Sequence, residues 1–285
     1  MKDEVQSKTR ASNDRPSDRP EPWGGLLAGA AAPDHIVQLY QDEKFLSRAV
    51  CRFAAAAIAN GEGVILVPTA AHWDAFRPRL EAEGVDVHAA QARHQLTVVD
   101  ADELLPQFMR NEMPDAPLFL GLAADVVAEA RGGGRPRKLR WWGEMVNVLW
   151  ERGEVQASMQ LEDLFDQLAH EQDLAIFCSF LMDNFNGDVH AKMLPRLGQN
   201  HSHLIPVEDY ERLERAVTRA LRDTVGIAEA GVLEGRLLGH NPGRLKMPRS
   251  QALLLALREV LPQVADSVLE RSRNIYAEAS DLASE

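Results

Sequence analysis

The segment WWGEMVNVLW, residues 141–150, places a carboxylate directly after two tryptophans and a glycine. Glu144 in this position could bind a group of a ligand or of a partner protein. It is also predicted to lie in the first turn of a helix, where a carboxylate gains about 0.3–1 kcal/mol from the helix dipole. The dipole alone is a sufficient structural reason for a glutamate. Successive strand residues point to opposite faces of a sheet, so we expect one of Trp141 and Trp142 to line a pocket and the other to pack under a helix.

Further candidate residues follow the other predicted strands. In an open α/β sheet, ligands bind outside the carboxyl ends of the strands. These ends are occupied by Tyr40, Gln41 and Asp42, by Pro68 and Thr69, by Asp100, and by Met182, Asp183 and Asn184. The predicted ligand-binding residues are Tyr40, Gln41, Thr69, Asp100, Trp141, Trp142 and Glu144.

The sequence contains none of the common nucleotide-binding or catalytic patterns that we considered. A phosphate cradle needs a glycine-rich loop, usually with a lysine, as in GxxxxGK[ST], and this pattern does not occur. The first strand–helix junction instead reads YQDEK, in which Asp42 and Glu43 place two negative charges. The patterns GxSxG, HExxH and CxxC are absent as well. We therefore predict no catalytic residue, no cofactor and no enzymatic activity.

Histidines near residue 200 raise the question of a metal site. His201 and His203, with Asp188 and His190 upstream, could be drawn as a metal cluster. No clear third ligand stands at a fixed spacing, so we predict a surface loop and no bound metal. Cys51 and Cys178 each lie in an apolar periodic segment and are predicted to be buried small hydrophobic residues.

The elements that must position these residues alternate along the chain. Strand patterns at 35–40, 64–67, 96–99, 138–142 and 174–180 are separated by segments with helical periodicity. This alternation predicts an α/β fold, with a mostly parallel sheet and helices on both faces.

The two ends of the chain differ from this α/β part. Residues 1–33 are polar and rich in proline and predict a disordered arm. Residues 34–206 hold the sheet, and residues 207–285 show helical periodicity alone, which predicts an all-helical region for output or dimerisation. The amphipathic segment 264–282 is suited to a homodimer contact.

The composition bears on partners and compartment. The formal net charge of −12 disfavours nucleic acid as a partner. Two basic segments, 131–140 and 243–249, are interpreted as solvated loops. No apolar run approaches the ~20 residues of a membrane span, and the N-terminus lacks the apolar core of a secretory signal. We therefore predict a cytoplasmic protein without membrane attachment.

Five segments in order resemble the MEDS domain, the methanogen/methylotroph DcmR sensory domain. They are HIVQLYQDEKFL, GEGVILVPTAAH, LRWWGEMVNVLWERG, LEDLFDQLA and HSHLIPVEDY, and the resemblance covers residues 34–210. It implies a RecA/KaiC-like core with a degenerate phosphate loop, and a sensor of small molecules such as hydrocarbon derivatives. The positions that carry the resemblance are His35, Gln38, Tyr40, Gly143, Glu144, Met145, Glu162, His201, Ser202, Pro206, Glu208 and Tyr210.

These observations lead to one preferred function and three alternatives. We expect a non-enzymatic regulator whose sensor domain binds a small molecule or a signalling partner such as a histidine kinase. One alternative is a residual nucleotide-binding ATPase of KaiC type. Another is a transcriptional regulator that binds DNA through its C-terminal helices. The remaining one is a pure protein-binding platform.

Overall fold

The computed structural model describes residues 22–132, 137–237 and 245–281. Its centre is a six-stranded sheet in the order β3-β2-β6-β7-β1-β8, and every pairing in it is parallel. The strands are β1 (His35–Tyr40), β2 (Gly63–Val67), β3 (Leu96–Val98), β6 (Leu139–Gly143), β7 (Leu174–Leu181) and β8 (His203–Ile205). The predicted α/β class and parallel sheet are therefore confirmed.

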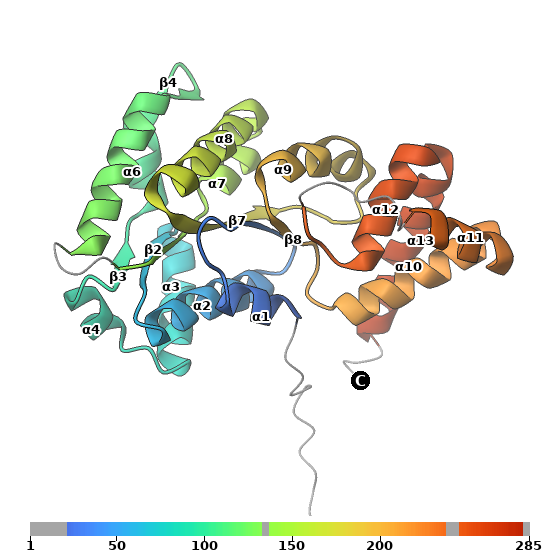
Figure 1. The fold of residues 1–285 in the computed structure, drawn as a ribbon, viewed down its shortest axis with the longest axis horizontal. Helices are drawn as coiled ribbons and strands as arrows, with labels where there is room; N and C mark the ends of the chain where they lie inside the picture. The colour runs from blue at the N-terminus through green and yellow to red at the C-terminus, as the bar shows by residue number, and fades with distance from the viewer. Residues whose placement is uncertain (1–21, 133–136, 238–244, 282–285) are drawn as a thin grey trace, which may run out of the picture.

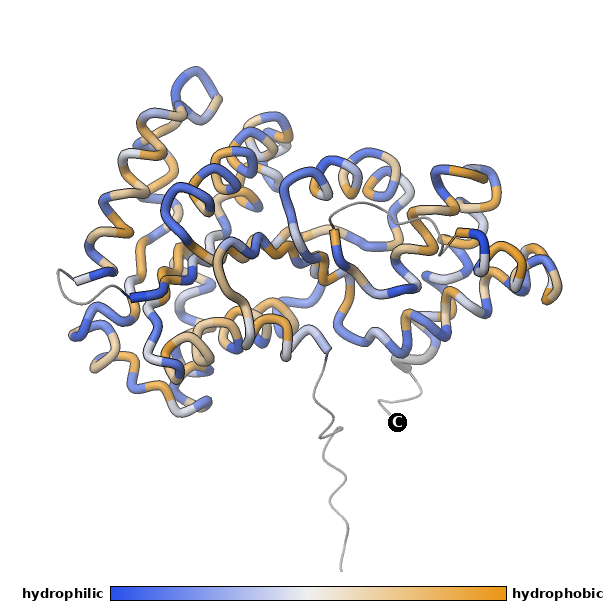
Figure 2. The backbone as a smooth tube through the Cα atoms, in the orientation of Figure 1, coloured by the Kyte–Doolittle hydropathy of each residue, from blue (hydrophilic) through white to orange (hydrophobic). Residues whose placement is uncertain are grey.

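The four central strands are buried along nearly their whole length. Every residue of β1, β2 and β6 is buried, and only the last residue of β7 is partly exposed. Strands that are covered on both faces need no alternation of polar and apolar residues, which explains the continuous apolar run LAIFCSFL of β7. Figure 2 shows this apolar centre between two layers of helices.

Helices cover both faces of the sheet (Figure 1). One layer holds α1 (Pro22–Ala28), α2 (Glu43–Ala59), α3 (Ala70–Ala82) and α4 (Val87–Ala92). The opposite layer holds α5 (Ala101–Phe108), α6 (Ala116–Arg131), α7 (Met145–Glu151), α8 (Val155–Gln172) and α9 (Leu194–Asn200). Each layer forms its own hydrophobic core with one face of the sheet.

Residues 22–33 are ordered, so the prediction of a disordered arm is wrong for this part. Helix α1 buries Trp23 and Leu27. Arg140, from β6, is 2 % exposed and donates hydrogen bonds to the carbonyls of Leu27 and Ala28 at 2.8 and 3.1 Å. It also bonds the Glu62 carboxylate at 2.6 Å. A basic residue that we had assigned to a solvated loop therefore anchors α1. Residues 1–21 lie outside the described residues.

The C-terminal region is helical, as predicted. It consists of α10 (Tyr210–Val225), α11 (Ile227–Leu237), α12 (Arg249–Val260) and α13 (Pro262–Asp281), which share a separate core. The sequence patterns missed several short elements, α4 and α9 among them, and four that are shorter still. These four are the hairpin of β4 (Met109–Arg110) and β5 (Met113–Pro114), the π-helical turn η1 (Val189–Met193), and β8 at the sheet edge. Elements of two to five residues are too short to show a periodicity.

Candidate functional site

The parallel sheet brings the carboxyl ends of its strands to one edge, where the predicted ligand-binding residues separate into two groups. Thr69 and Glu144 follow the neighbouring strands β2 and β6. Tyr40 and Gln41 lie at the end of β1, which pairs with β7. Asp100 belongs to neither group. Its side chain accepts hydrogen bonds from the next helix at 2.8 and 3.1 Å, so it caps the N-terminus of α5.

The Glu144 carboxylate joins two helices across the sheet edge. It is 2 % exposed. It accepts a hydrogen bond from the backbone N–H of Thr69, the N-cap residue of α3, and a second from Nδ1 of His72. Its side chain makes no capping bond to its own helix α7. Glu144 does lie at the N-terminus of α7, but its hydrogen bonds go to the N-terminal turn of α3.

His72 lies between two carboxylates. Its Nε2 is 2.8 Å from Oε2 of Glu43, opposite the bond to Glu144, and its ring stacks on Phe76. Burial alone would lower the pKa of His72, but the bonds and charges of Glu144 and Glu43 raise it to about 9. The arrangement is thus a carboxylate–imidazolium–carboxylate bridge at neutral pH. We did not single out His72 from the sequence, although its position in the first turn after a strand end was a usable signal.

The stability of the protein should depend on pH through His72. Its pKa rises from 6.5 to about 9 on folding, so its contribution is fully present below pH 6.5 and is lost as the pH rises through 9. We expect the stability difference between wild type and His72→Gln to shrink by roughly 1–2 kcal/mol over this window, allowing for solvent screening of the ring. Urea unfolding of both proteins at several pH values measures it. A difference that stays constant with pH would contradict the bridge.

Neither tryptophan before Glu144 lines a pocket, contrary to the expectation for one of them. Trp141 and Trp142 do point to opposite faces of the sheet, as predicted, but both are fully buried. Trp141 packs edge-on against Phe165 under α8. Trp142 packs against Phe76 and donates a hydrogen bond to Ser179 at 3.1 Å. Successive side chains of β6 point to opposite faces of the sheet. Both faces are covered by helices, so each tryptophan ring lies in one of the two cores.

A cavity of about 360 Å³ lies at the carboxyl ends of β1 and β7. Its wall on the sheet side comes from the β1–α2 and β7–η1 connections, and its other wall comes from α10 and α13. The lining residues are Tyr40, Gln41, Asp42, Phe45, Met182, Asp183, Asn184, Phe185, Pro206, Val207, Glu208, Arg212, Arg273, Tyr276 and Ala277. The volume is within the range of small-molecule pockets.

The two arginines of the cavity are engaged with other groups of the protein. Arg273 on α13 pairs with the Asp183 carboxylate and bonds the Phe185 carbonyl at 3.2 Å. Arg212 on α10 lies 4.1 Å from the centre of the Tyr276 ring and bonds the backbone of α13. Both guanidinium groups thus brace helices around the cavity. The cavity surface that a ligand could contact consists mainly of aromatic rings and a methionine side chain, with a few polar groups.

Comparison with known families identifies the α/β part of the chain. The family model of the MEDS domain, the MEthanogen/methylotroph, DcmR Sensory domain, matches residues 34–195. The chain belongs to the MEDS family. A search among characterised proteins gave no match. In the part of the chain that the structure describes, no helix combines the length and the apolar character needed to cross a membrane.

Several positions that carry the MEDS resemblance are structural. Gln38 is fully buried and accepts a hydrogen bond from Ser179 at 3.3 Å. Met145 begins α7 and lies in the core. Glu208 lines the cavity, and its carboxylate pairs with Arg48. The other such positions are Gly143 at the end of β6, Tyr210 at the start of α10, and Ser202, which bonds the backbone of β1.

Three further motif residues meet inside the α/β part of the chain. His35, Glu162 and His201 are buried together with Cys178, far along β1 from the cavity. The grouping drawn from the sequence around residue 200 does not form this cluster. His190 donates a hydrogen bond to a backbone carbonyl at 2.7 Å, and His203 lies beside Ser202 at the sheet edge. The prediction that Cys178 is buried is confirmed.

Proposed function

We propose that this protein is a non-enzymatic signalling regulator whose MEDS domain binds a small organic molecule in the cavity at the carboxyl ends of β1 and β7. Membership of a sensory-domain family indicates a role in signalling. The observation that carries the proposal is the shared wall of the cavity, because the sheet contributes one side and helices α10 and α13 contribute the other. A ligand there would contact the sensor domain and the C-terminal helices at once.

Hydrogen bonds and an ion pair connect the cavity wall to the C-terminal helices. Asn184, which lines the cavity, donates a buried hydrogen bond to Gln251 of α12 at 2.9 Å. The Asn184 carbonyl accepts a hydrogen bond from His190. Burial lowers the pKa of His190 to about 4, so the ring is a neutral donor at physiological pH. A ligand that moves the β7–η1 connection would therefore act on α12 directly and on α13 through the Asp183–Arg273 pair.

The cavity favours a modest, largely uncharged ligand. Four aromatic side chains and one methionine line it, and its two arginines already have protein partners. Burial also raises the pKa of Tyr40, whose hydroxyl accepts a hydrogen bond from Asn147, so this residue offers a neutral phenol. Asp42 and Glu43 occupy the junction where a phosphate loop would lie, which argues against a nucleotide.

Filling the cavity should abolish ligand binding. We expect calorimetry on the full chain, with a panel of short alcohols, aldehydes, halogenated hydrocarbons and aromatic acids, to detect at least one ligand. Ala277→Leu, which places a larger side chain in the cavity, should weaken it by about tenfold or more. Trp23 is a convenient reporter because its indole bonds the carbonyl of Glu208 in the cavity wall at 3.0 Å.

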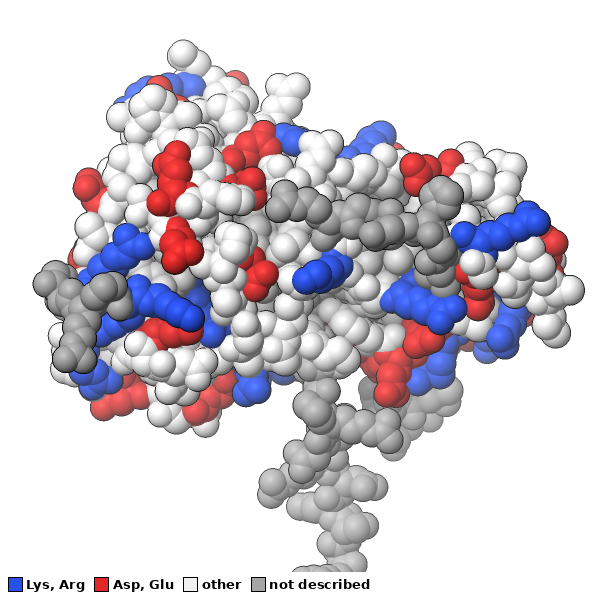
Figure 3. Space-filling view, viewed as in Figure 1, with Lys and Arg blue, Asp and Glu red and all other residues white. Residues whose placement is uncertain are grey.

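Ala228→Leu is the matched control, since this alanine is exposed on α11 and does not line the cavity. Equal affinity of both variants, or a panel without any binder, would contradict the proposal. ATP with Mg²⁺ and duplex DNA serve as further titrants for the two alternative functions. On the face shown in Figure 3, acidic and basic side chains of the described residues are interspersed, unlike the single-sign surface that DNA favours.

Three earlier expectations remain predictions. They are the likeness to RecA and KaiC, the cytoplasmic location, and a partner such as a histidine kinase. A homodimer through the C-terminal helices also remains a prediction. Helix α11 exposes Ile227 and Val232 by 79 % and 44 %, which gives such a contact an apolar surface.

A further inference from the structure

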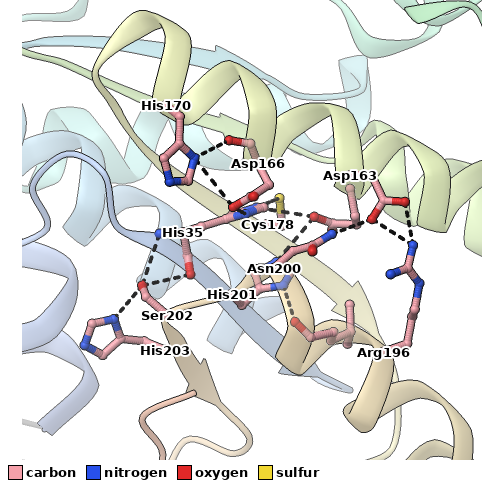
Figure 4. A network of polar contacts seen from close by, with 12 residues as sticks. His35, Asp163, Asp166, His170, Cys178, Arg196, Asn200, His201, Ser202 and His203 are labelled. Atoms are coloured by element: carbon pink, nitrogen blue, oxygen red, sulfur yellow. Dashed lines mark hydrogen bonds and ion pairs between the residues drawn. The ribbon is translucent and has the colours of Figure 1, made fainter. Parts of the chain in front are cut away.

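Four side chains with metal-binding atoms meet in the interior of the α/β part of the chain. Figure 4 labels three of them, His35, Cys178 and His201. His35 begins β1, Glu162 lies on α8, Cys178 lies within β7, and His201 immediately follows α9. All four residues are buried, and their donor atoms lie within 4.8 Å of one another. Residues from four separate parts of the chain thus direct one thiol, one carboxylate and two imidazoles at a common point.

Three distances within this cluster fit metal coordination. Nε2 of His35 lies 3.4 Å from Sγ of Cys178 and 3.3 Å from Oε2 of Glu162. Nε2 of His201 lies 3.3 Å from the same oxygen. A tetrahedral ion with bonds of about 2.0–2.1 Å holds nitrogen and oxygen ligands about 3.3 Å apart. A charge-assisted hydrogen bond would instead bring such atoms to about 2.7–2.9 Å.

The cluster leaves buried polar atoms without a hydrogen bond, although both imidazoles lie within ion-pair distance of Oε2 of Glu162. Among the described residues, the two carboxylate oxygens of Glu162 have no hydrogen-bond partner, and Nε2 of His201 has none either. Unpartnered buried polar atoms are costly, and a buried carboxylate most of all. A divalent cation would accept a lone pair from each ligand. One thiolate, one carboxylate and two neutral imidazoles would also balance its double positive charge, so the buried site would be neutral.

The surroundings orient one of the two imidazoles for this role, whereas Nδ1 of His35 has no hydrogen bond. Nδ1 of His201 donates a hydrogen bond to the Leu197 carbonyl at 2.8 Å, which leaves the lone pair of Nε2 facing the cluster. Nδ1 of His35 points toward Asp166, with Oδ1 at 3.7 Å. Metal-bound histidines commonly have a carbonyl or carboxylate on the far ring nitrogen, which sets the tautomer and the ring orientation.

We propose that His35, Glu162, Cys178 and His201 form a closed site for one divalent metal ion, with zinc as the chemical type. Borderline N, S and O ligands suit zinc, and four protein ligands leave no open position for a reacting water. The ion would therefore tie β1, β7, α8 and the segment after α9 together. It would lie apart from the cavity, because His35 and Tyr40 begin and end the same strand, about 16 Å apart. This proposal departs from the sequence-based prediction of no metal.

Cobalt substitution tests the site directly on the full chain. We expect the protein to bind about one Co²⁺ per chain, with a thiolate-to-cobalt charge-transfer band in the near ultraviolet and visible bands of tetrahedral cobalt. Zn²⁺ should displace both signals. Cys178→Ser should lose the charge-transfer band and bind metal at least tenfold more weakly. Cys51→Ser is the matched control, because Cys51 is equally buried but lies in the opposite core, and it should behave as wild type.

A second measurement covers the case in which Cys178→Ser does not fold. Removing metal from wild type with a chelator should lower the melting temperature by about 5 °C or more, and Zn²⁺ should restore it. Wild-type protein that binds Co²⁺ without a thiolate band, or binds no metal after exposure to excess Zn²⁺ or Co²⁺, would overturn the proposal. In that case the cluster is a buried ion pair between imidazole and carboxylate. Ligand binding in the cavity does not enter either result, so this test is independent of the proposed function.

Discussion

Replacing Glu144 by alanine is expected to lower the free energy of unfolding by about 2–3 kcal/mol. The substitution removes the carboxylate that accepts the N–H of Thr69 and holds the protonated ring of His72. It leaves a cation and a backbone donor at a largely buried position without their acceptor. Urea unfolding at pH 7, followed by circular dichroism, measures the loss.

Glu43→Ala provides the control for this prediction. Glu43 bonds the same ring of His72, but its side chain is 60 % exposed, so we expect a loss below about 1 kcal/mol. Both carboxylates bond His72, so the difference in stability loss between the two variants measures the effect of burial. If the two variants lose equal stability, the bridge is a surface ion pair and Glu144 has no special role in joining α3 to β6.

Replacing Arg140 by methionine is expected to cost about 2–4 kcal/mol and to loosen helix α1. Methionine retains an unbranched stem beside Phe53, so the cost arises from the lost guanidinium. Without it, the Glu62 carboxylate and the last carbonyls of α1 lose their donor. Urea unfolding gives the loss of stability, and hydrogen exchange of peptides from residues 22–33 should accelerate.

Arg152→Met is the matched control for Arg140→Met. Arg152 pairs with Asp102, and the side chains are 49 % and 57 % exposed, so its loss should change stability by less than about 0.5 kcal/mol. Slow hydrogen exchange of residues 22–33 in Arg140→Met would show that α1 is held by its apolar contacts alone, through Trp23 and Leu27.

The parallel sheet could be predicted because its signal is local. Uniformly apolar runs such as LAIFCSFL, separated by helical segments, require a sheet that is covered on both faces. The same local patterns located the strand ends and therefore Tyr40, Thr69 and Glu144 at one edge. They failed for α1, whose last carbonyls accept hydrogen bonds from Arg140 in a strand more than one hundred residues later.

The partners of each side chain could not be predicted in this way. Glu144 was considered for ligand binding or for the dipole of its own helix, and the structure shows that it bonds the start of α3. Both tryptophans pack in the two cores. The wall of the cavity formed by α13 comes from residues about 90 positions away from Asp183. No spacing rule links residues at such separations, because their proximity follows from the order of the strands.

By itself, the sequence determined the class of the fold, the edge where the strands end, the absence of a phosphate loop and the relationship to the MEDS family, since each depends on short segments. Only the tertiary structure decided which residues meet. It separated His201 from the neighbouring His203 and placed it with His35, Glu162 and Cys178, because the strand order β7-β1-β8 brings these distant segments under α8. Periodicity in the sequence shows which face of a helix or strand is buried. The chemistry of a site depends on which side chains of other elements contact that face.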